Sequence, residues 1–280
     1  MSFVEIEEKF CSHEEWIKFS SENKFIFDGS YIKFAISEIK KRGIIDINNN
    51  VVLNPESIII KGENYRETIK HGLLNCRNRA LIYALKKFGS YGRSDLLARS
   101  CKIYAPEALT DFALHMRAKY PLFIGSEYAS NQQQREKIFP ILSEDLTDLS
   151  FESSVFDLVI TNDVLEHVPD IDKSLCEIFR ILNSAGLLLT NVPFAFNKKE
   201  SVVRSVMKNG NIFHLLPPQY HGNPMDPAGG SLVYEIPGWD LVSRAKSAGF
   251  HDSYFLFISS IKYGIIGKGL AGVFIFFAVK

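Results

Sequence analysis

The chain has 280 residues, which is long enough for one α/β domain with an accessory segment. Lysine plus arginine and aspartate plus glutamate both number 32, so the net charge is zero and nothing predicts nucleic-acid binding. Hydrophobic residues make up 46% of the chain, which excludes a disordered protein and allows a sizeable core. The N-terminus has no apolar signal segment, and the most apolar stretch is too short to cross a bilayer. We therefore expect a cytoplasmic globular protein without a membrane span.

Cysteine and histidine spacing gives no sign of a metal site. The four cysteines are far apart and form no CxxC pair, which is typical of reduced thiols in a cytosolic protein. His214 and His221 are seven positions apart with Asp226 nearby, which is no metal-ligand spacing. The sequence alone therefore predicts no metal.

The first part of the chain mixes aromatic and charged residues with weak periodicity. Residues 14–43 predict a short helix, a turn, and a second helix that ends at Gly43. Residues 44–60 alternate like short strands around an asparagine-rich turn. A helical pattern then extends from about Asn64 to Gly89. We expect an N-terminal accessory segment over residues 1–63 and the main domain over residues 64–280.

From residue 101 onward, apolar runs of strand length alternate with helical patterns. Continuous apolar runs separated by helices indicate a parallel sheet covered on both faces. Two successive strands at the C-terminus predict an antiparallel hairpin on the sheet edge. The expected strands are residues 101–105, 121–128, 137–142, 156–161, 185–194, 252–260 and 272–280, and the expected helices are residues 108–120, 170–182 and 238–248.

One segment carries a specific resemblance. Residues 156–194 read FDLVITNDVLEHVPDIDKSLCEIFRILNSAGLLLTNVPF. This segment resembles the fourth strand, the next helix and the fifth strand of the class I S-adenosylmethionine (AdoMet)-dependent methyltransferases of type 11. The resemblance implies a Rossmann-like, doubly wound α/β fold in three layers, with a mostly parallel seven-stranded sheet. It also implies AdoMet as methyl donor, bound at the carboxyl ends of the strands.

The resemblance assigns residues to the nucleoside end of the cofactor. Glu127 takes the place of the acidic residue that holds the ribose hydroxyls, because a carboxylate accepts two hydrogen bonds from a vicinal diol. Asp145 takes the place of the aspartate that meets the adenine amino group, with Leu146 beside it to cover the ring. Glu144 and Asp148 are rivals for the place of Asp145.

The methionine end is assigned less completely. Asn162 and Asp163 fall where the family lines this end of the cofactor. The glycine-rich loop that normally follows the first strand is missing, and the sequence there is YAPEALT. Either Glu107, with the backbone amides of Ala108 and Leu109, substitutes for that loop, or cofactor binding has been weakened or lost.

Acceptor-side residues are expected in the Pro- and Gly-rich insert over residues 195–237, which in this fold commonly roofs the active site. Tyr220 and His221 lie on a short, stiff loop there, and His221 is our candidate general base, with His214 as an alternative. His167 follows the fourth strand and either shapes the pocket or takes part in catalysis. Upstream of the first strand, Arg77 and Arg79 either bind an anionic group or form ordinary ion pairs.

The leading hypothesis is a cytoplasmic methyltransferase that acts at oxygen on a small-molecule or sugar acceptor, with methylation at nitrogen left open as an alternative. The segment ahead of the first strand also resembles methyltransferases associated with polysaccharide biosynthesis. Residues 1–60 either cover the acceptor site or make the contact of a homodimer. A methyltransferase-like binding module without turnover is the alternative. An NAD-dependent or nucleotide-sugar oxidoreductase is disfavoured, because the GxGxxG fingerprint is missing.

Overall fold

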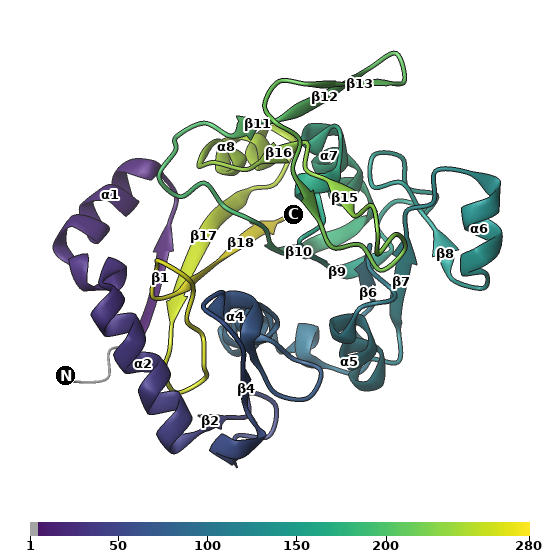
Figure 1. Ribbon diagram of the computed structural model, residues 1–280. Coiled ribbons are helices and arrows are strands. Elements are labelled where there is room, and N and C mark those ends of the chain that lie inside the picture. The colour runs from purple at the N-terminus through teal and green to yellow at the C-terminus, as the bar shows by residue number, and fades with distance from the viewer. Residues whose placement is uncertain (1–4) are drawn as a thin grey trace. The chain divides into compact units, whose positions relative to one another are not determined.

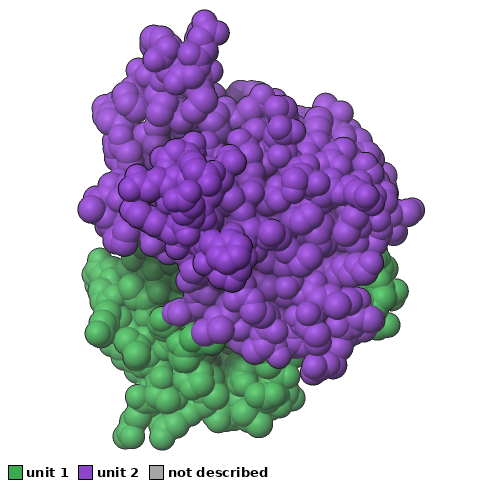
Figure 2. Space-filling model, turned by 90° about the vertical axis from the view of Figure 1, so that its right-hand side faces the viewer, with its two compact units in different colours: residues 1–97, 254–275 green, residues 98–253, 276–280 purple. Residues whose placement is uncertain are grey.

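The computed structural model describes residues 5–280, which form two compact units (Figure 1). Unit 1 comprises residues up to Leu97 and residues 254–275, and unit 2 comprises residues 98–253 and 276–280 (Figure 2). The strand that ends the chain begins in unit 1 and finishes in unit 2. The boundary expected at residue 63 stays a prediction.

Unit 1 is built around an antiparallel edge of the sheet. Its strand order is β1-β17-β18, and Phe10 of β1 is opposite Phe255 of β17. Trp16 is buried among aromatic rings of this unit, at 5.3 Å from the ring of Phe257 and 4.9 Å from that of Phe274. The elements of unit 1 are β1 (Ile6–Phe10), α1 (His13–Glu22), η1 (Lys24–Phe27), α2 (Gly29–Arg42), β2 (Ile44–Ile45), β3 (Val52–Leu53), η2 (Pro55–Ser57), β4 (Ile59–Ile60), α3 (Tyr65–Thr68), β5 (Ile69–Lys70), α4 (Cys76–Ser90) and η3 (Ser94–Leu97), with most of β17 (Asp252–Ser259) and the start of β18 (Val273–Val279).

Unit 2 contains the parallel part of the sheet. Its order is β8-β7-β6-β9-β10-β18, with β18 antiparallel to β10. Counted along the chain, the parallel strands therefore lie in the order 3-2-1-4-5 of a doubly wound sheet. The elements of unit 2 are β6 (Ile103–Ala105), α5 (Asp111–Lys119), β7 (Phe123–Glu127), α6 (Gln132–Ile138), β8 (Leu142–Ser143), β9 (Phe156–Asn162), η4 (Leu165–His167), α7 (Ile171–Ile181), β10 (Leu182–Asn191), β11 (Val202–Val203), β12 (Ser205–Lys208), β13 (Asn211–His214), β14 (Tyr220–His221), β15 (Ser231–Leu232), β16 (Glu235–Ile236) and α8 (Asp240–Ser247).

The segment β9–α7–β10 forms as its sequence predicts. Residues 158–160 and 187–189 are buried on both faces of the sheet, which explains their continuous apolar sequence. Helix α7 begins after Asp170, whose side chain accepts a hydrogen bond from the Lys173 amide at 2.9 Å. Figure 1 shows α5 on one face of this sheet and α7 and α8 on the other, so the predicted three-layer α/β fold is confirmed.

Several predicted elements differ from the structure. The strand expected over residues 137–142 is wrong, because α6 extends to Ile138 and only residues 142–143 form β8. Asn131 caps α6 by accepting from the Gln134 amide, which fixes a helix where the apolar run predicted a strand. The helix expected from Asn64 is interrupted by β5 and restarts at Cys76.

The sheet has one strand more than the seven expected, and the additional strand is β1. The insert over residues 195–237 also contains regular structure, namely the antiparallel pairs β11–β16, β12–β13 and β14–β15. Within residues 5–280, no helix combines the length and the apolar character that crossing a membrane requires.

Candidate functional site

The carboxyl ends of four neighbouring parallel strands each carry an acidic residue. Glu127 is the last residue of β7, and Asp163 directly follows β9. Glu107 lies two residues after β6, and Asp145 two residues after β8. Strands β6 and β9 are neighbours at the point where the order of the sheet reverses, which is where open α/β sheets bind ligands. The structure therefore brings four of the predicted cofactor-binding side chains to the expected edge.

The turn after β6 is held by the neighbouring strand. Oε1 of Glu127 accepts hydrogen bonds from the backbone amides of Ala108 at 2.8 Å and Leu109 at 2.9 Å. Glu127 is 9% exposed, and this burial raises the pKa of its carboxyl, while the two amide bonds partly offset the rise. Ala108 can bind the cofactor's carboxylate, as the sequence predicts, only if its amide leaves Glu127.

The turn after β6 has no glycine, but a glycine on the adjacent strand β7 lies against it. A Cβ atom on Gly125 of β7 would lie 3.0 Å from the carbonyl oxygen of Glu107 and 3.1 Å from Cα of Ala108. These distances are shorter than ordinary van der Waals contact, so a side chain at this position would push the turn away from β7. Glu107 itself is buried and accepts a hydrogen bond from the Thr110 hydroxyl at 2.8 Å, and Thr110 caps helix α5.

In the loop after β8, the three acidic residues that compete for the adenine contact have different surroundings. Both carboxylate oxygens of Glu144 are bonded to Ser150, through its amide at 2.9 Å and its hydroxyl at 2.5 Å, so Glu144 has a structural role in this loop. Asp145 is exposed, and its Oδ1 accepts from the amide and hydroxyl of Thr147. Asp148 is also exposed, and Leu146 is buried. Asp145 thus stays available to a ligand, whereas Glu144 does not.

The turn after β9 is tightly constrained. Asn162 is buried at the end of the strand, and Asp163 adopts a left-handed backbone with φ of 57°. Its amide donates to the carbonyl oxygen of Asn191 at 2.8 Å, which ties the turn to β10. Aspartate is one of the few residue types that tolerate this conformation. The turn leads directly into η4, which carries Glu166 and His167.

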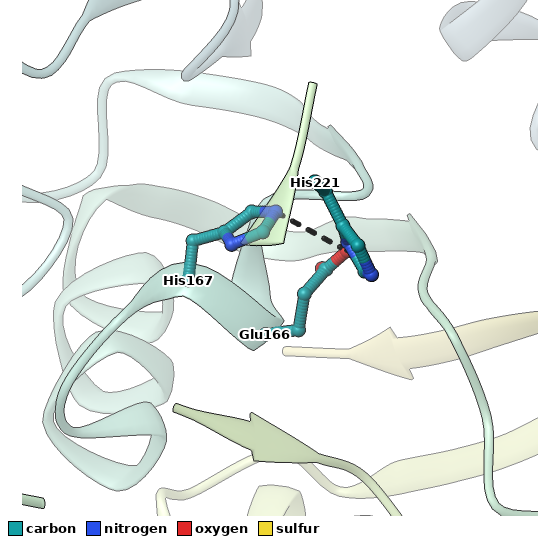
Figure 3. Close-up of side chains that lie close together, drawn as sticks. All are labelled: Glu166, His167 and His221. Carbon is teal, nitrogen blue, oxygen red and sulfur yellow. Dashed lines mark ion pairs between the residues drawn. The ribbon is translucent and has the colours of Figure 1, made fainter. Parts of the chain in front are cut away.

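Glu166 is the functional candidate that our sequence analysis missed. Its side chain is fully buried, and Oε1 lies 3.5 Å from Nε2 of His167 and 3.3 Å from Nδ1 of His221 (Figure 3). The two imidazole rings are perpendicular, with centroids 5.1 Å apart. We call these three residues the acid–histidine cluster. The signal in the sequence was the LEH tripeptide that follows the fourth strand.

The insert supplies the third member of the cluster through a short strand pair. In β14–β15, His221 is opposite Ser231 and Tyr220 is opposite Leu232. The carbonyl oxygen of Leu232 is 2.8 Å from Nδ1 of His167. The strand pair therefore provides His221 and also contacts His167. Successive strand residues face opposite sides, which agrees with the 54% exposure of Tyr220.

The other predicted catalytic and anion-binding residues lie elsewhere. The structure brings His167 and His221 together, but it does not place Tyr220 or His214 in the cluster, and His214 is bonded to the Ser205 hydroxyl at 2.9 Å. In unit 1, Arg79 is 2% exposed and donates to four backbone carbonyl oxygens, so it holds that unit together. Arg77 pairs with Glu67 at 2.8 Å, as in an ordinary ion pair.

Comparison with known proteins gives one family match. Residues 121–190 match the family described as a methyltransferase domain. No curated protein matches the chain. The family match over residues 121–190 and the doubly wound strand order both agree with the class that the sequence resembles, the class I AdoMet-dependent methyltransferases. The predicted resemblance is confirmed, and AdoMet is the cofactor of this class.

The solved structures that match the chain share little sequence with it. The YcgJ protein from Bacillus subtilis is 18% identical over 39% of this chain and 51% of that chain, with a TM-score of 0.31, so this chain spans about half of its length. A possible histamine N-methyltransferase from Thermotoga maritima is 14% identical over 72% of this chain and 97% of that chain, with a TM-score of 0.40. Phosphoethanolamine N-methyltransferase 2 from Haemonchus contortus, in complex with phosphomonomethylethanolamine and S-adenosylhomocysteine, is 15% identical over 65% and 38% of the two chains, with a TM-score of 0.39.

The chemistry of the strand ends fits AdoMet. Besides the carboxylate of its methionine end, the cofactor presents a ribose diol, an adenine amino group, an ammonium group and a sulfonium, which are hydrogen-bond donors or cations. Carboxylates suit each of these groups, and the edge carries four of them. A dinucleotide would instead place its pyrophosphate here, and phosphates need free backbone amides. The amides of Ala108 and Leu109 are bonded to Glu127, which disfavours that ligand.

Proposed function

We propose that the chain is an AdoMet-dependent methyltransferase that methylates an oxygen of a small-molecule or sugar acceptor. The observation that carries this proposal is the row of carboxylates at the ends of β8, β7, β6 and β9, within a domain of the methyltransferase class. When bound, the cofactor supplies an activated methyl group on its sulfonium. The cytoplasmic location, a homodimer and a link to polysaccharide biosynthesis stay predictions.

Specific residues would hold the cofactor. Glu127 would accept from the ribose through the oxygen that is not bonded to the turn after β6. Asp145, exposed on its loop, would accept from the adenine amino group. Glu107, Asn162 and Asp163 flank the point where the sheet order reverses and would meet the methionine end.

The acid–histidine cluster provides the acceptor chemistry. An acceptor hydroxyl must lose its proton as its oxygen takes the methyl group, so the site needs a group that handles this proton. His221 comes from the insert, whereas Glu166 and His167 come directly after β9, a strand that borders the cofactor edge. We propose that the acceptor oxygen binds at this cluster and that the insert over residues 195–237 selects the acceptor. Tyr220, exposed beside His221, would contact the acceptor rather than its reacting oxygen.

A turnover assay tests this function. The purified protein is incubated with AdoMet and a panel of sugars and small hydroxyl compounds, and formation of S-adenosylhomocysteine is measured. We expect turnover with at least one acceptor class, abolished in Asp145→Ala and in His221→Ala. Asp148→Ala decides between the two rival acids and should retain activity. Exposed Glu152→Ala is the control for loss of a negative charge.

The outcome also separates the enzyme from the alternative. AdoMet binding without turnover on any acceptor would support a non-catalytic binding module. Turnover that persists in Asp145→Ala but is lost in Asp148→Ala would overturn our assignment of the adenine contact.

A further inference from the structure

We propose that Glu166, His167 and His221 form a binding site for a divalent transition-metal ion, with an open coordination position for an oxygen of the acceptor. The three side chains each offer one ligand atom, and these atoms all lie within 4.8 Å of one another. One carboxylate with two imidazoles is a common donor set for zinc and other first-row divalent metals. Metal binding itself does not depend on the proposed function, whereas binding of the acceptor at the open coordination position rests on it.

The first argument is the environment of Glu166. Its carboxylate is fully buried, and within residues 5–280 neither oxygen accepts a hydrogen bond from a protein group. A buried carboxylate is stable only with strong compensation from a positive charge or hydrogen bonds. Here the groups within ion-pair distance are the imidazoles of His167 and His221. A metal cation held by all three residues supplies the missing compensation.

The second argument is the orientation of His167. Its Nδ1 lies 2.8 Å from the carbonyl oxygen of Leu232, and a carbonyl oxygen can only accept a hydrogen bond. Nδ1 therefore carries the proton, and in the neutral ring Nε2 presents a lone pair toward Oε1 of Glu166 at 3.5 Å. Two electron-rich atoms that face one another repel unless a proton or a metal cation lies between them.

The third argument is distance, which favours a metal over a proton. A charged N–H···O bond between an imidazolium and a carboxylate is about 2.7–2.9 Å long. The observed separations from Oε1 of Glu166 are 3.3 and 3.5 Å, longer than such bonds. Two ligands on a tetrahedral ion with bonds of about 2.0–2.1 Å lie about 3.3–3.4 Å apart. The two separations from Glu166 thus match the ligand spacing of a tetrahedral metal site, and all three ligand atoms lie within 4.8 Å of one another.

The surroundings of the cluster complete the site. A metal-binding histidine typically donates its other ring N–H to a carbonyl or similar acceptor, as His167 does to Leu232. Nε2 of His221 lies 3.1 Å from the side-chain amide nitrogen of Gln219. If the amide group is flipped by about 180°, its oxygen accepts the hydrogen bond from Nε2–H of His221.

Access to the cluster indicates where the acceptor would bind. The side chains of His167 and His221 are 16% and 28% exposed, so solvent or an acceptor can reach the fourth position. Zinc sites that keep three protein ligands and an open position are catalytic rather than structural. A metal there lowers the pKa of a bound hydroxyl group, so the acceptor proton is released to solvent and His221 acts as a ligand instead of a base.

Metal titration tests the site without any methyl transfer. The full-length protein is treated with a chelator, dialysed, and titrated with Zn²⁺ by calorimetry, and binding of Co²⁺ is followed by its visible absorption. We expect one equivalent of Zn²⁺ and a tetrahedral Co²⁺ spectrum, with affinity at least a hundredfold lower in His221→Ala and in Glu166→Gln. His214→Ala is the matched control, because this insert histidine lies outside the cluster, and it should bind like the wild type.

The outcomes are distinct. Equal Zn²⁺ affinity in the wild type, His221→Ala and Glu166→Gln would overturn the proposal, as would absence of binding in a folded wild type. Circular dichroism checks that each variant is folded. Because His221 is partly exposed, we expect His221→Ala to fold, and it still tests the site if Glu166→Gln unfolds. AdoMet binding is measured separately on the chelated protein, so a failed metal site and a failed methyltransferase function are told apart. Turnover unaffected by chelation would make His221 the direct base and contradict the acceptor role of the metal.

Discussion

Replacing Glu127 tests how the turn after β6 is stabilised without a glycine-rich loop. In Glu127→Ala, the buried amide of Ala108 loses its partner, whereas the amide of half-exposed Leu109 can bind water instead. An unsatisfied buried donor costs about 1–3 kcal/mol, so the free energy of unfolding should fall by about 2–3 kcal/mol in total. Glu127→Gln keeps an acceptor oxygen and removes the cost of burying a charge, so it should change stability by less than about 1 kcal/mol.

Urea unfolding followed by circular dichroism measures both values, with exposed Glu152→Ala as the control. Both Glu127 variants should also bind AdoMet more weakly, because each removes the negative charge at the ribose position. A free energy of unfolding of Glu127→Ala within about 0.5 kcal/mol of the wild type would contradict this role of Glu127, as would equal losses of stability in the glutamine and alanine variants.

Three further predictions follow from the same structure. Gly125→Ala places a Cβ closer than ordinary van der Waals contact to the backbone at Glu107 and Ala108, and we expect the free energy of unfolding to fall by about 1–3 kcal/mol, measured by thermal unfolding. Arg79→Met leaves four carbonyl oxygens without their donor, so unit 1 should lose at least about 3 kcal/mol in urea; wild-type stability would contradict the role assigned to this side chain. Because the pKa of Glu127 is raised above its ordinary 4.5, its contribution to stability is complete below that pH and declines as pH rises through the raised value; Glu127→Gln should lack this decline in pH-dependent urea unfolding.

The sequence was most informative where local signals and burial agree. Strands β9 and β10 are continuous apolar runs because they are buried on both faces, and Asp170 caps the helix between them. The prediction failed at residues 137–142, where an apolar run belongs partly to a helix whose start is fixed by Asn131. Strand β1 was missed because its sequence, IEEKF, has charged residues in its centre and gains stability from pairing with β17.

The candidate site was predictable in part for a related reason. Acidic residues at strand ends can be found from the sequence, because a strand's end is a local feature. The acid–histidine cluster depends instead on the pairing of β14 with β15, which brings His221 to residues 55 and 54 positions earlier in the chain, Glu166 and His167. Nothing in the local spacing of His214 and His221 indicates this contact. The hydrogen bond from the Ala108 amide to Glu127 likewise joins residues of two different strand ends, so the sequence does not indicate it.

The central claim is that the carboxylate edge of unit 2 binds AdoMet although the turn after β6 lacks glycine. Calorimetric titration of the wild-type protein with AdoMet tests it most directly. We expect a single site with micromolar affinity, weakened at least tenfold in Asp145→Ala and unchanged in Glu152→Ala. Absence of binding at millimolar AdoMet to the folded protein would contradict it.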